Sequence, residues 1–245
     1  MIPKIIHYCW FGGKPLSDDT KKYILTWKKY CSDYEIIEWN ENNFDIYQNQ
    51  YCKEAYKAKK WAFVSDYARL KILYDYGGIY LDTDVEVCKS FNDLLNLDFY
   101  SCYENDKIST AVLGAKKKDW YIEMLLNDYN NRSFITVSGE YDYTTNVQRI
   151  SDITYKKFNL IKCDNYDLIT NNHVIFTSDY FNPKDVFSGK ISKTKNTYAI
   201  HHYEGSWQSR TQKNKMILRR LLTNILSEKF VLDLIKIKNI ILKKD

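Results

Sequence analysis

The sequence predicts a fold of the α/β class, in which helices flank a central sheet. Two stretches of the chain indicate this. The first forty residues are patterned as strand, helix and strand, and residues 53–87 are patterned as a helix followed by a strand across a glycine pair. Strands that alternate with helices are typical of α/β folds. The length of 245 residues suits one large domain, or one domain with an appendage.

The first three elements follow from local signals. PKIIHYCW, at 3–10, is rich in strand-forming residues and ends before two glycines. Ser17, with two aspartates directly after it, predicts the start of a helix over about 17–30. YEIIEWN, at 34–40, is the second strand, since its isoleucines and tryptophan suit a sheet beside polar turn residues.

The next helix and strand hold the most informative residues. A helix is predicted over about 53–75, where large apolar residues recur at helical spacing, and the glycine pair that follows ends it. IYLDTDVEV, at 79–87, alternates with period two. This alternation predicts one strand on which Asp82 and Asp84 project to the same side, about 6–7 Å apart.

The remaining elements are predicted with less detail. Strands are expected at 98–104 and 109–115, and a helix at about 118–129 that joins a Tyr- and Asn-rich connection. A late strand is expected within NTYAIHHYEGSW, at 196–207. Internal repeats and Pro- or Ser-rich linkers are absent, which predicts one domain over 1–209.

The segment 210–245 differs from the rest of the chain in charge. It is rich in Lys and Arg, and the net charge of +5 arises there, so nucleic-acid binding by the whole chain is not indicated. Its Leu and Ile residues recur at helical spacing, which predicts one or two basic amphipathic helices. Two roles stay open for them: packing on the domain, or docking on an anionic membrane face.

Bulk features favour a cytosolic protein. The N-terminal apolar run is short and lacks a small-residue cleavage site, so no signal peptide is expected. No stretch approaches the roughly 18 apolar residues of a membrane span. The six cysteines form no C-x-x-C pair, which predicts reduced thiols. Together these features place the protein in the cytoplasm, with peripheral attachment to the inner membrane face as an option.

Two carboxylates on one strand face can bind a divalent cation. Mg²⁺ and Mn²⁺ prefer oxygen ligands, and such a cation can neutralise a diphosphate leaving group. A lone D-x-D is nevertheless more often a solvated strand end. Two rival motifs fit poorly, because an EF-hand loop starting at Asp82 needs Gly where Val87 stands, and the aspartyl-phosphatase pattern needs Thr or Val where Glu86 stands.

The helix before the D-x-D adds two polar residues. Asp66 and Arg69 lie one turn apart, and the glycine turn returns the chain so that helix and strand lie side by side. Arg69 can bind a phosphate or a sugar hydroxyl. The alternative is an ion pair between Asp66 and Arg69 on the helix surface.

The stretch FVSDYARLKILYDYGGIYLDTDVEV closely resembles the core of glycosyltransferase family 32, which is also similar to the catalytic domains of the large clostridial glucosylating toxins. IPKIIHYCWFGG and YAIHHYEGSW fit the same pattern in the same order, so the resemblance spans about residues 2–207. It implies a GT-A fold with a mixed central sheet, a UDP-sugar donor, a Mn²⁺ or Mg²⁺ ion, and retention of anomeric configuration. Many bacterial members build capsular or other surface polysaccharides.

The resemblance also implies roles for individual residues. Asp84 is the main metal ligand, and Asp82 approaches the ribose, or the metal through water. Asp66 and Arg69 contact the hydroxyls of the donor sugar and the phosphates. Tyr80 lines the same pocket.

The late HHYEGSW stretch is implied to close the site from the other side. Imidazole is an acceptable Mn²⁺ ligand, and strand alternation lets only one of His201 and His202 reach the metal. His201 is preferred, since His202 shares a face with Ile200, which is expected in the core. Ser206 and Trp207 are expected to bond the diphosphate.

The sequence gives less information on the residues near the uracil base of the donor and near the acceptor. Trp10 matches the tryptophan that stacks on uracil in the toxin relatives, with a core aromatic as the alternative, and His7 is expected to be structural. VSGEYDYTTNVQRI lacks the Gly-Pro turn of many family members. This region is expected to shape the acceptor side, with Glu104, Asp106 and Asn146 as candidates.

The prediction is therefore a retaining glycosyltransferase that transfers a sugar from a UDP-sugar to a glycan or lipid-linked acceptor. Front-face attack, with the donor phosphate accepting the proton, is favoured over a covalent intermediate, because no strongly placed nucleophile is visible. Two alternatives stay open. One is a toxin-like glucosyltransferase that modifies a protein; the other is a non-catalytic nucleotide-sugar-binding module, which the full set of carboxylates and histidines disfavours.

Overall fold

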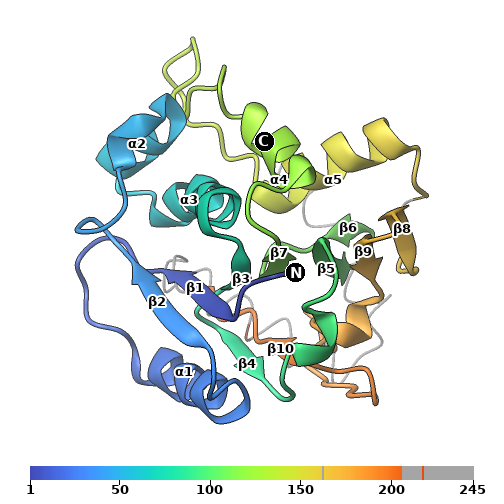
Figure 1. Cartoon of the computed structure of the whole chain (residues 1–245). Coiled ribbons are helices and arrows are strands. Elements are labelled where there is room, and N and C mark those ends of the chain that lie inside the picture. Colours follow the sequence, from blue (N-terminus) through green and yellow to red (C-terminus); the bar gives the residue numbers. More distant parts are fainter. Residues whose placement is uncertain (162, 206–216, 218–245) are drawn as a thin grey trace. The chain divides into compact units, whose positions relative to one another are not determined.

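The computed structural model describes residues 1–161, 163–205 and 217. The chain divides into two compact units: Met1–Pro183 with Lys193–His202, and Lys184–Ser192 with Tyr203–Asp245. The first unit holds the central sheet (Figure 1). In the second unit Lys184 forms an antiparallel bridge with Ile191. The predicted helices of 210–245, apart from Ile217, and the predicted site residues Ser206 and Trp207 lie outside the described residues.

The central sheet is mixed, as the sequence predicted. Its strands follow the order β2-β1-β3-β7-β5-β9-β8, and β6 pairs with β5. The strands are β1 (Ile5–Cys9), β2 (Glu35–Trp39), β3 (Gly78–Leu81), β5 (Phe99–Glu104), β6 (Lys107–Ile108), β7 (Val112–Ala115), β8 (Asp167–Thr170) and β9 (His173–Phe176). β1 runs parallel to β2 and β3, β5 runs parallel to β9, and β7 is antiparallel to β3 and β5. The predicted α/β class is confirmed.

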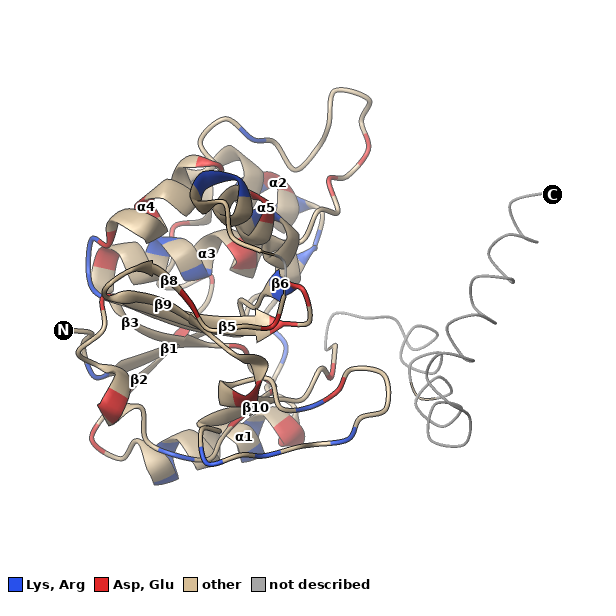
Figure 2. Cartoon of the chain, turned by 90° about the vertical axis from the view of Figure 1, so that its right-hand side faces the viewer, with Lys and Arg blue, Asp and Glu red and all other residues tan. Residues whose placement is uncertain are grey.

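Helices cover both faces of this sheet. One face carries α2 (Gln50–Lys57), α3 (Trp61–Tyr76), α4 (Trp120–Asn127) and α5 (Asn146–Phe158); the other carries α1 (Asp18–Tyr30) and a two-stranded sheet of β4 (Val85–Val87) and β10 (Ala199–His201), as Figures 1 and 2 show. Short 3₁₀ helices span Ile46–Gln48, Asn92–Leu94 and Ser178–Tyr180. Each face has its own buried core. Alternate residues of β3 supply both cores, since Tyr80 packs in one while Ile79 and Leu81 pack in the other.

The single helix predicted over 53–75 is wrong, because the structure has α2 and α3 there. α2 ends in a Schellman motif, in which Lys60 N donates to Ala55 O (2.9 Å) and Lys59 N donates to Tyr56 O (2.9 Å). Lys59 takes the left-handed conformation that this motif requires, with φ of 57°. The apolar spacing continues across the break, so periodicity alone did not reveal it.

The segment expected as a Tyr- and Asn-rich connection after residue 129 contains α5. Thr145 caps this helix, and its side chain accepts from Gln148 N at 3.3 Å. Residues at helical spacing, such as Ile150 and Thr154, are buried. The helix was missed because most of its residues are polar, and β8 and β9 were not predicted either.

The glycine pair after α3 is required by close packing. Gly77 has φ of +69° and ends the helix, and a Cβ there would lie 2.6 Å from Lys117 N. Gly78 has φ of +111°, and a Cβ there would lie 2.7 Å from Ile5 O. The predicted helix end at these glycines is confirmed.

His7 supports this turn from β1. Its Nε2 donates to Gly77 O (2.8 Å), and its Nδ1 accepts from Trp39 Nε1 (3.1 Å). Burial lowers the pKa of His7 to about 4, so the ring is neutral near pH 7. Both ring nitrogens serve the fold, as the sequence predicted.

The prediction of one continuous strand over 79–87 is wrong. β3 ends at Leu81 and β4 begins at Val85, and the turn between them is closed by a bond from Val85 N to Asp82 O (3.1 Å). β3 belongs to the main sheet, whereas β4 pairs with β10. Asp82 and Asp84 therefore flank Thr83 in a turn. The chain leaves the main sheet here because β4 finds its backbone partners on β10.

Two further predictions concern bulk features. All six cysteines are among the described residues, and all are free thiols. No helix in the described part of the chain is long and apolar enough to cross a membrane.

Candidate active site

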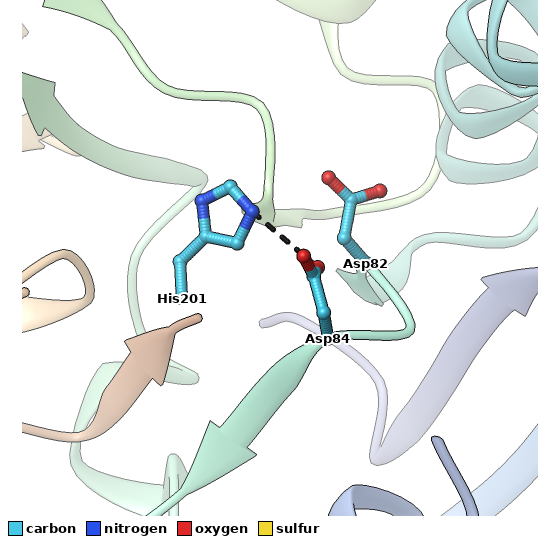
Figure 3. Close-up of side chains that lie close together, drawn as sticks. All are labelled: Asp82, Asp84 and His201. Carbon is cyan, nitrogen blue, oxygen red and sulfur yellow. Dashed lines mark ion pairs between the residues drawn. The ribbon is translucent and has the colours of Figure 1, made fainter. Parts of the chain in front are cut away.

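Asp82, Asp84 and His201 form a carboxylate–histidine cluster. One ligand atom from each residue can be chosen so that all three lie within 4.8 Å of one another. Figure 3 shows the two carboxylates and the imidazole converging, with His201 Nε2 3.3 Å from Asp84 Oδ1. Carboxylate oxygens suit Mg²⁺ and Mn²⁺, and imidazole is acceptable to Mn²⁺. The donor set therefore fits a divalent cation.

The pairing of β4 with β10 brings the distant histidine to the turn. In this antiparallel ladder His201 stands opposite Val85, and His202 N donates to Asp84 O (3.0 Å). Trp27 of α1 donates from Nε1 to Val85 O (2.7 Å). The site thus depends on two short strands that α1 supports.

The two histidines separate as strand alternation predicted. His201 belongs to the cluster, whereas His202 donates from Nε2 to Glu86 Oε2 (2.9 Å). The His202 ring also stacks on Tyr23, with centroids 4.8 Å apart. His202, one of the candidate metal ligands, therefore lies apart from the cluster.

Arg69 links α3 to the cluster through Asp82. Its Nη2 lies 3.1 Å from Asp66 Oδ1, and its Nη1 lies 3.1 Å from Asp82 Oδ1. Nη1 also donates to Thr110 O (2.8 Å), and the guanidinium lies 4.6 Å from the Tyr80 ring centroid. The Tyr80 hydroxyl donates to Asp82 Oδ1 (3.0 Å). The predicted residues of α3 and the D-x-D thus form one network.

Thr110 is a member of this network that the sequence did not indicate. Its backbone carbonyl accepts from Arg69 Nη1 at 2.8 Å, and its hydroxyl accepts from the same nitrogen at 3.3 Å. It precedes β7, and β7 lies beside β3 in the sheet. Only the strand order places this carbonyl next to Arg69.

Burial and charge shift several pKa values at the site, those of Asp66 and His201 among them. Burial raises the pKa of Asp66 to about 6, although Arg69 opposes this rise. Burial would lower the pKa of His201, but the charges of Asp84, Glu104 and Asp82 outweigh it and raise the pKa to about 9. The negative field that favours a proton on His201 also favours a divalent cation at the cluster.

The three acceptor-side candidates differ in position. Glu104 ends β5; its charge acts on His201, and it accepts a long bond from Ser109 Oγ (3.4 Å). Asn146 donates from N to Asp66 Oδ2 and from Nδ2 to Asp66 O, both at 3.2 Å. Asp106 lies in the β5–β6 turn. Glu104 and Asn146 therefore adjoin the site network.

Trp10 follows β1 and is half-buried, with Nε1 donating to Lys14 O (2.5 Å). An open hollow of about 830 Å³ begins two residues later, and Gly12, Lys14, Tyr56 and Trp61 contribute to its lining. It adjoins the carboxyl ends of the parallel strands β1 and β2, where α/β proteins commonly bind ligands.

The chain is similar in sequence to known glycosyltransferases. Residues 17–100 match the sequence model of the family described as "Glycosyltransferase sugar-binding region containing DXD motif". An uncharacterized glycosyltransferase of Acanthamoeba polyphaga mimivirus is 27% identical over 224 residues, which cover 84% of this chain and 84% of that protein. Inositol phosphoceramide mannosyltransferase 3 of Schizosaccharomyces pombe is 30% identical over 139 residues, or 51% of this chain and 37% of the yeast protein.

The crystal structure of a glycosyltransferase involved in the glycosylation of the major capsid of PBCV-1 aligns with 87% of this chain and 99% of its own, at 13% identity and a TM-score of 0.47. The family match covers Asp66, Arg69, Asp82 and Asp84. The family match and the names of the two relatives support a glycosyltransferase with a DXD motif.

Proposed function

We propose that the chain is a metal-dependent, retaining GT-A glycosyltransferase that transfers a sugar from a UDP-sugar to a hydroxyl of a glycan or lipid-linked acceptor. The observation that carries this proposal is the carboxylate–histidine cluster, because its two aspartates are the DXD motif of the matched region. The third member, His201, arrives from the far end of the described chain.

Asp84 and His201 would hold Mn²⁺ or Mg²⁺, with Asp82 close by. Such a cation supplies Lewis-acid stabilisation of the departing UDP. The donor atoms of the cluster fit this task, since two are carboxylate oxygens and one is an imidazole nitrogen.

Asp66 and Arg69 would orient the donor. Arg69 is engaged by two carboxylates and the Thr110 carbonyl, so its first task is to hold Asp66 and Asp82 in place. Both oxygens of Asp66 are also engaged, one by Arg69 and the other by Asn146 N. We therefore favour front-face attack, in which the donor phosphate accepts the acceptor's proton, over a covalent intermediate on Asp66.

The acceptor and location belong to the same proposal. A lipid-linked acceptor at the inner membrane face is suggested by the basic amphipathic pattern of 210–245. In this arrangement Trp10 would face the uracil, and the open hollow near it would receive the nucleoside.

The proposal is tested by a screen of UDP- and GDP-sugars for thermal stabilisation in Mn²⁺, followed by hydrolysis assays of the hits. At least one UDP-sugar is expected to stabilise the wild-type chain and to be hydrolysed slowly. Asp84→Ala is expected to lower hydrolysis by more than about 100-fold, because metal stabilisation of a leaving group is worth several kcal/mol. Asp33→Ala, at an exposed salt bridge with Lys4, is the matched control.

Two results would overturn the proposal. One is stabilisation by no nucleotide sugar, and the other is normal turnover in Asp84→Ala. A labelled donor incubated with membrane glycolipid or with cell lysate then distinguishes a glycan acceptor from a protein acceptor.

A further inference from the structure

The connection from α4 to α5 contains a hairpin over 134–143 that is built around aromatic rings. Thr136 N donates to Glu140 O, and Asp142 N donates to Phe134 O, both at 2.8 Å. The Phe134 ring is fully buried, and the Tyr141 ring stacks on it with centroids 5.2 Å apart. The hairpin is therefore held by backbone bonds and by a buried ring.

Two tyrosines of this hairpin, Tyr141 and Tyr143, form an exposed aromatic platform. Tyr141 is 39% exposed and Tyr143 is 57% exposed, and their rings meet at nearly 90° with centroids 6.0 Å apart. Tyr143 also packs edge-on against Phe134. Neighbouring rings hold both tyrosines in place, and part of each ring stays open to solvent.

The hairpin is anchored at both ends. Ile135 N donates to Glu54 Oε2 of α2 (2.9 Å), and Figure 1 shows this part of the chain beside α2. The Asp142 carboxylate pairs with the Arg149 guanidinium of α5. Because these anchors hold the hairpin, a ligand would lose little free energy in ordering the platform.

The platform and the candidate active site both contact α3. Phe63 of α3 packs against Tyr143 with ring centroids 5.8 Å apart, and Asp66 of α3 binds Asn146. Phe63 and Asp66 are three residues apart in α3, which is a rise of about 4.5 Å along the helix. Arg69, which binds the D-x-D, follows one turn later. The platform therefore lies about two helical turns from the Arg69 end of the site network.

A cation lies over the rings of the platform. Lys60 Nζ lies 5.6 Å from the Tyr141 ring centroid and 5.3 Å from the Tyr143 ring centroid. The C–H face of a sugar ring packs on an aromatic face, while its hydroxyls accept bonds from an ammonium group or exchange them with phenols. Glu140 of the hairpin disfavours an anionic membrane as the ligand. Partly exposed rings together with an ammonium group and two phenols match a saccharide.

We propose that Tyr141, Tyr143 and Lys60 form an acceptor subsite that holds a sugar unit near the one that receives the transferred sugar. The assignment of this saccharide as an acceptor rests on the proposed glycosyltransferase function. The binding of a saccharide at the platform does not rest on that function, so the binding proposal and the proposed function can fail separately.

The binding test applies the full-length chain to an array of immobilised neutral and acidic oligosaccharides. Wild type is expected to retain at least one glycan. The double variant Tyr141→Ala/Tyr143→Ala is expected to bind it about 10-fold or more weakly, since each lost ring removes a contact worth up to about a factor of ten. Tyr141→Phe/Tyr143→Phe keeps the rings and is expected to retain most of the binding. Tyr47→Ala removes an exposed tyrosine elsewhere and should have no effect.

The outcomes separate the platform from the proposed function. Hydrolysis of a UDP-sugar without acceptor depends on the cluster and reports on the proposed function alone. Retention of no glycan by wild type, or equal binding by the double alanine variant, overturns the platform. If the double alanine variant loses only its binding to phosphatidylserine vesicles, the saccharide proposal is also overturned, because the platform would then bind a membrane. If a retained glycan is also glycosylated, the alanine pair should raise the KM for that glycan.

Discussion

Replacement of Arg69 by alanine tests how the site network is held together. The Arg69 side chain is 6% exposed, and its guanidinium lies 3.1 Å from a carboxylate oxygen of Asp66 and 3.1 Å from one of Asp82. Arg69→Ala would leave both carboxylates without their shared cation. Since Asp66 belongs to α3 and Asp82 follows β3, the substitution would weaken the contact between α3 and the end of β3.

The expected magnitude follows from these distances. Each pair at 3.1 Å attracts by about 5 kcal/mol at an effective dielectric constant of about 20. Desolvation of the buried charges cancels much of this attraction, and removal of one partner from a buried pair costs about 3–5 kcal/mol in measured cases. We therefore expect Arg69→Ala to lower the free energy of unfolding by about 4 kcal/mol at pH 7.

The loss should depend on pH. Burial already raises the pKa of Asp66 to about 6, and removal of Arg69 would raise it further. A carboxyl whose pKa is higher in the folded than in the unfolded state destabilises the fold at high pH, and the penalty is relieved as pH falls through the folded pKa. The difference between Arg69→Ala and wild type should therefore shrink between pH 7 and pH 5.

Urea unfolding at both pH values measures this difference. Lys71→Ala is the matched control, because its ion pair with Asp75 on the same helix is partly exposed and should cost at most about 1 kcal/mol. Adding Asp66→Asn to Arg69→Ala should restore part of the lost stability. The reasoning is refuted if Arg69→Ala loses no more than Lys71→Ala, or loses the same amount at both pH values.

Two further predictions concern the turn that presents the D-x-D. The pKa of His7 is about 4 in the folded chain against 6.5 in the unfolded chain, so the stability that its neutral form provides is present above pH 6.5 and is lost as pH falls toward 4. In urea unfolding, acidification over this range should cost wild type about 3 kcal/mol more free energy of unfolding than it costs His7→Gln. Equal pH dependence of the two proteins would contradict this. Gly78→Ala should lose about 3 kcal/mol or more, because strain at φ of +111° adds to a Cβ contact of 2.7 Å with Ile5 O. Gly139→Ala, at φ of +83° in open space, should lose only about 1–2 kcal/mol, and equal losses would show that the contact is unimportant.

Local signals in the sequence identified the elements whose causes are themselves local. α1 begins after Ser17 because the Ser17 hydroxyl accepts from Thr20 N, and this cap is readable from residue type and position. β1 and β2 were predicted from their strand-forming residues and adjacent turn residues. The break at Lys59 was not predictable in this way, since a lysine in the left-handed conformation carries no glycine signal.

The D-x-D shows a different limit. The alternation over 79–87 is real, because Leu81 of β3 and Val85 of β4 are buried in the same core. A chain that turns from one sheet into another can keep the same burial pattern as a straight strand. The pattern therefore predicted that two aspartates would meet at one site, but the turn that brings them together depends on which partner β4 finds.

That partner determines whether the site exists. β4 has three residues, and such a short strand gains little from one ladder alone. Its backbone is bonded by β10 on one edge, and two side chains of α1 bond it on the other: Thr26 Oγ1 accepts from Val87 N (2.9 Å) and Trp27 Nε1 donates to Val85 O (2.7 Å). Because α1 side chains bond one edge of β4, only its other edge is open to pair with β10. In the observed register His201 stands opposite Val85, next to the turn. The D-x-D specifies the chemistry, and α1, which precedes it by some fifty residues, fixes the geometry in which a third ligand can reach it.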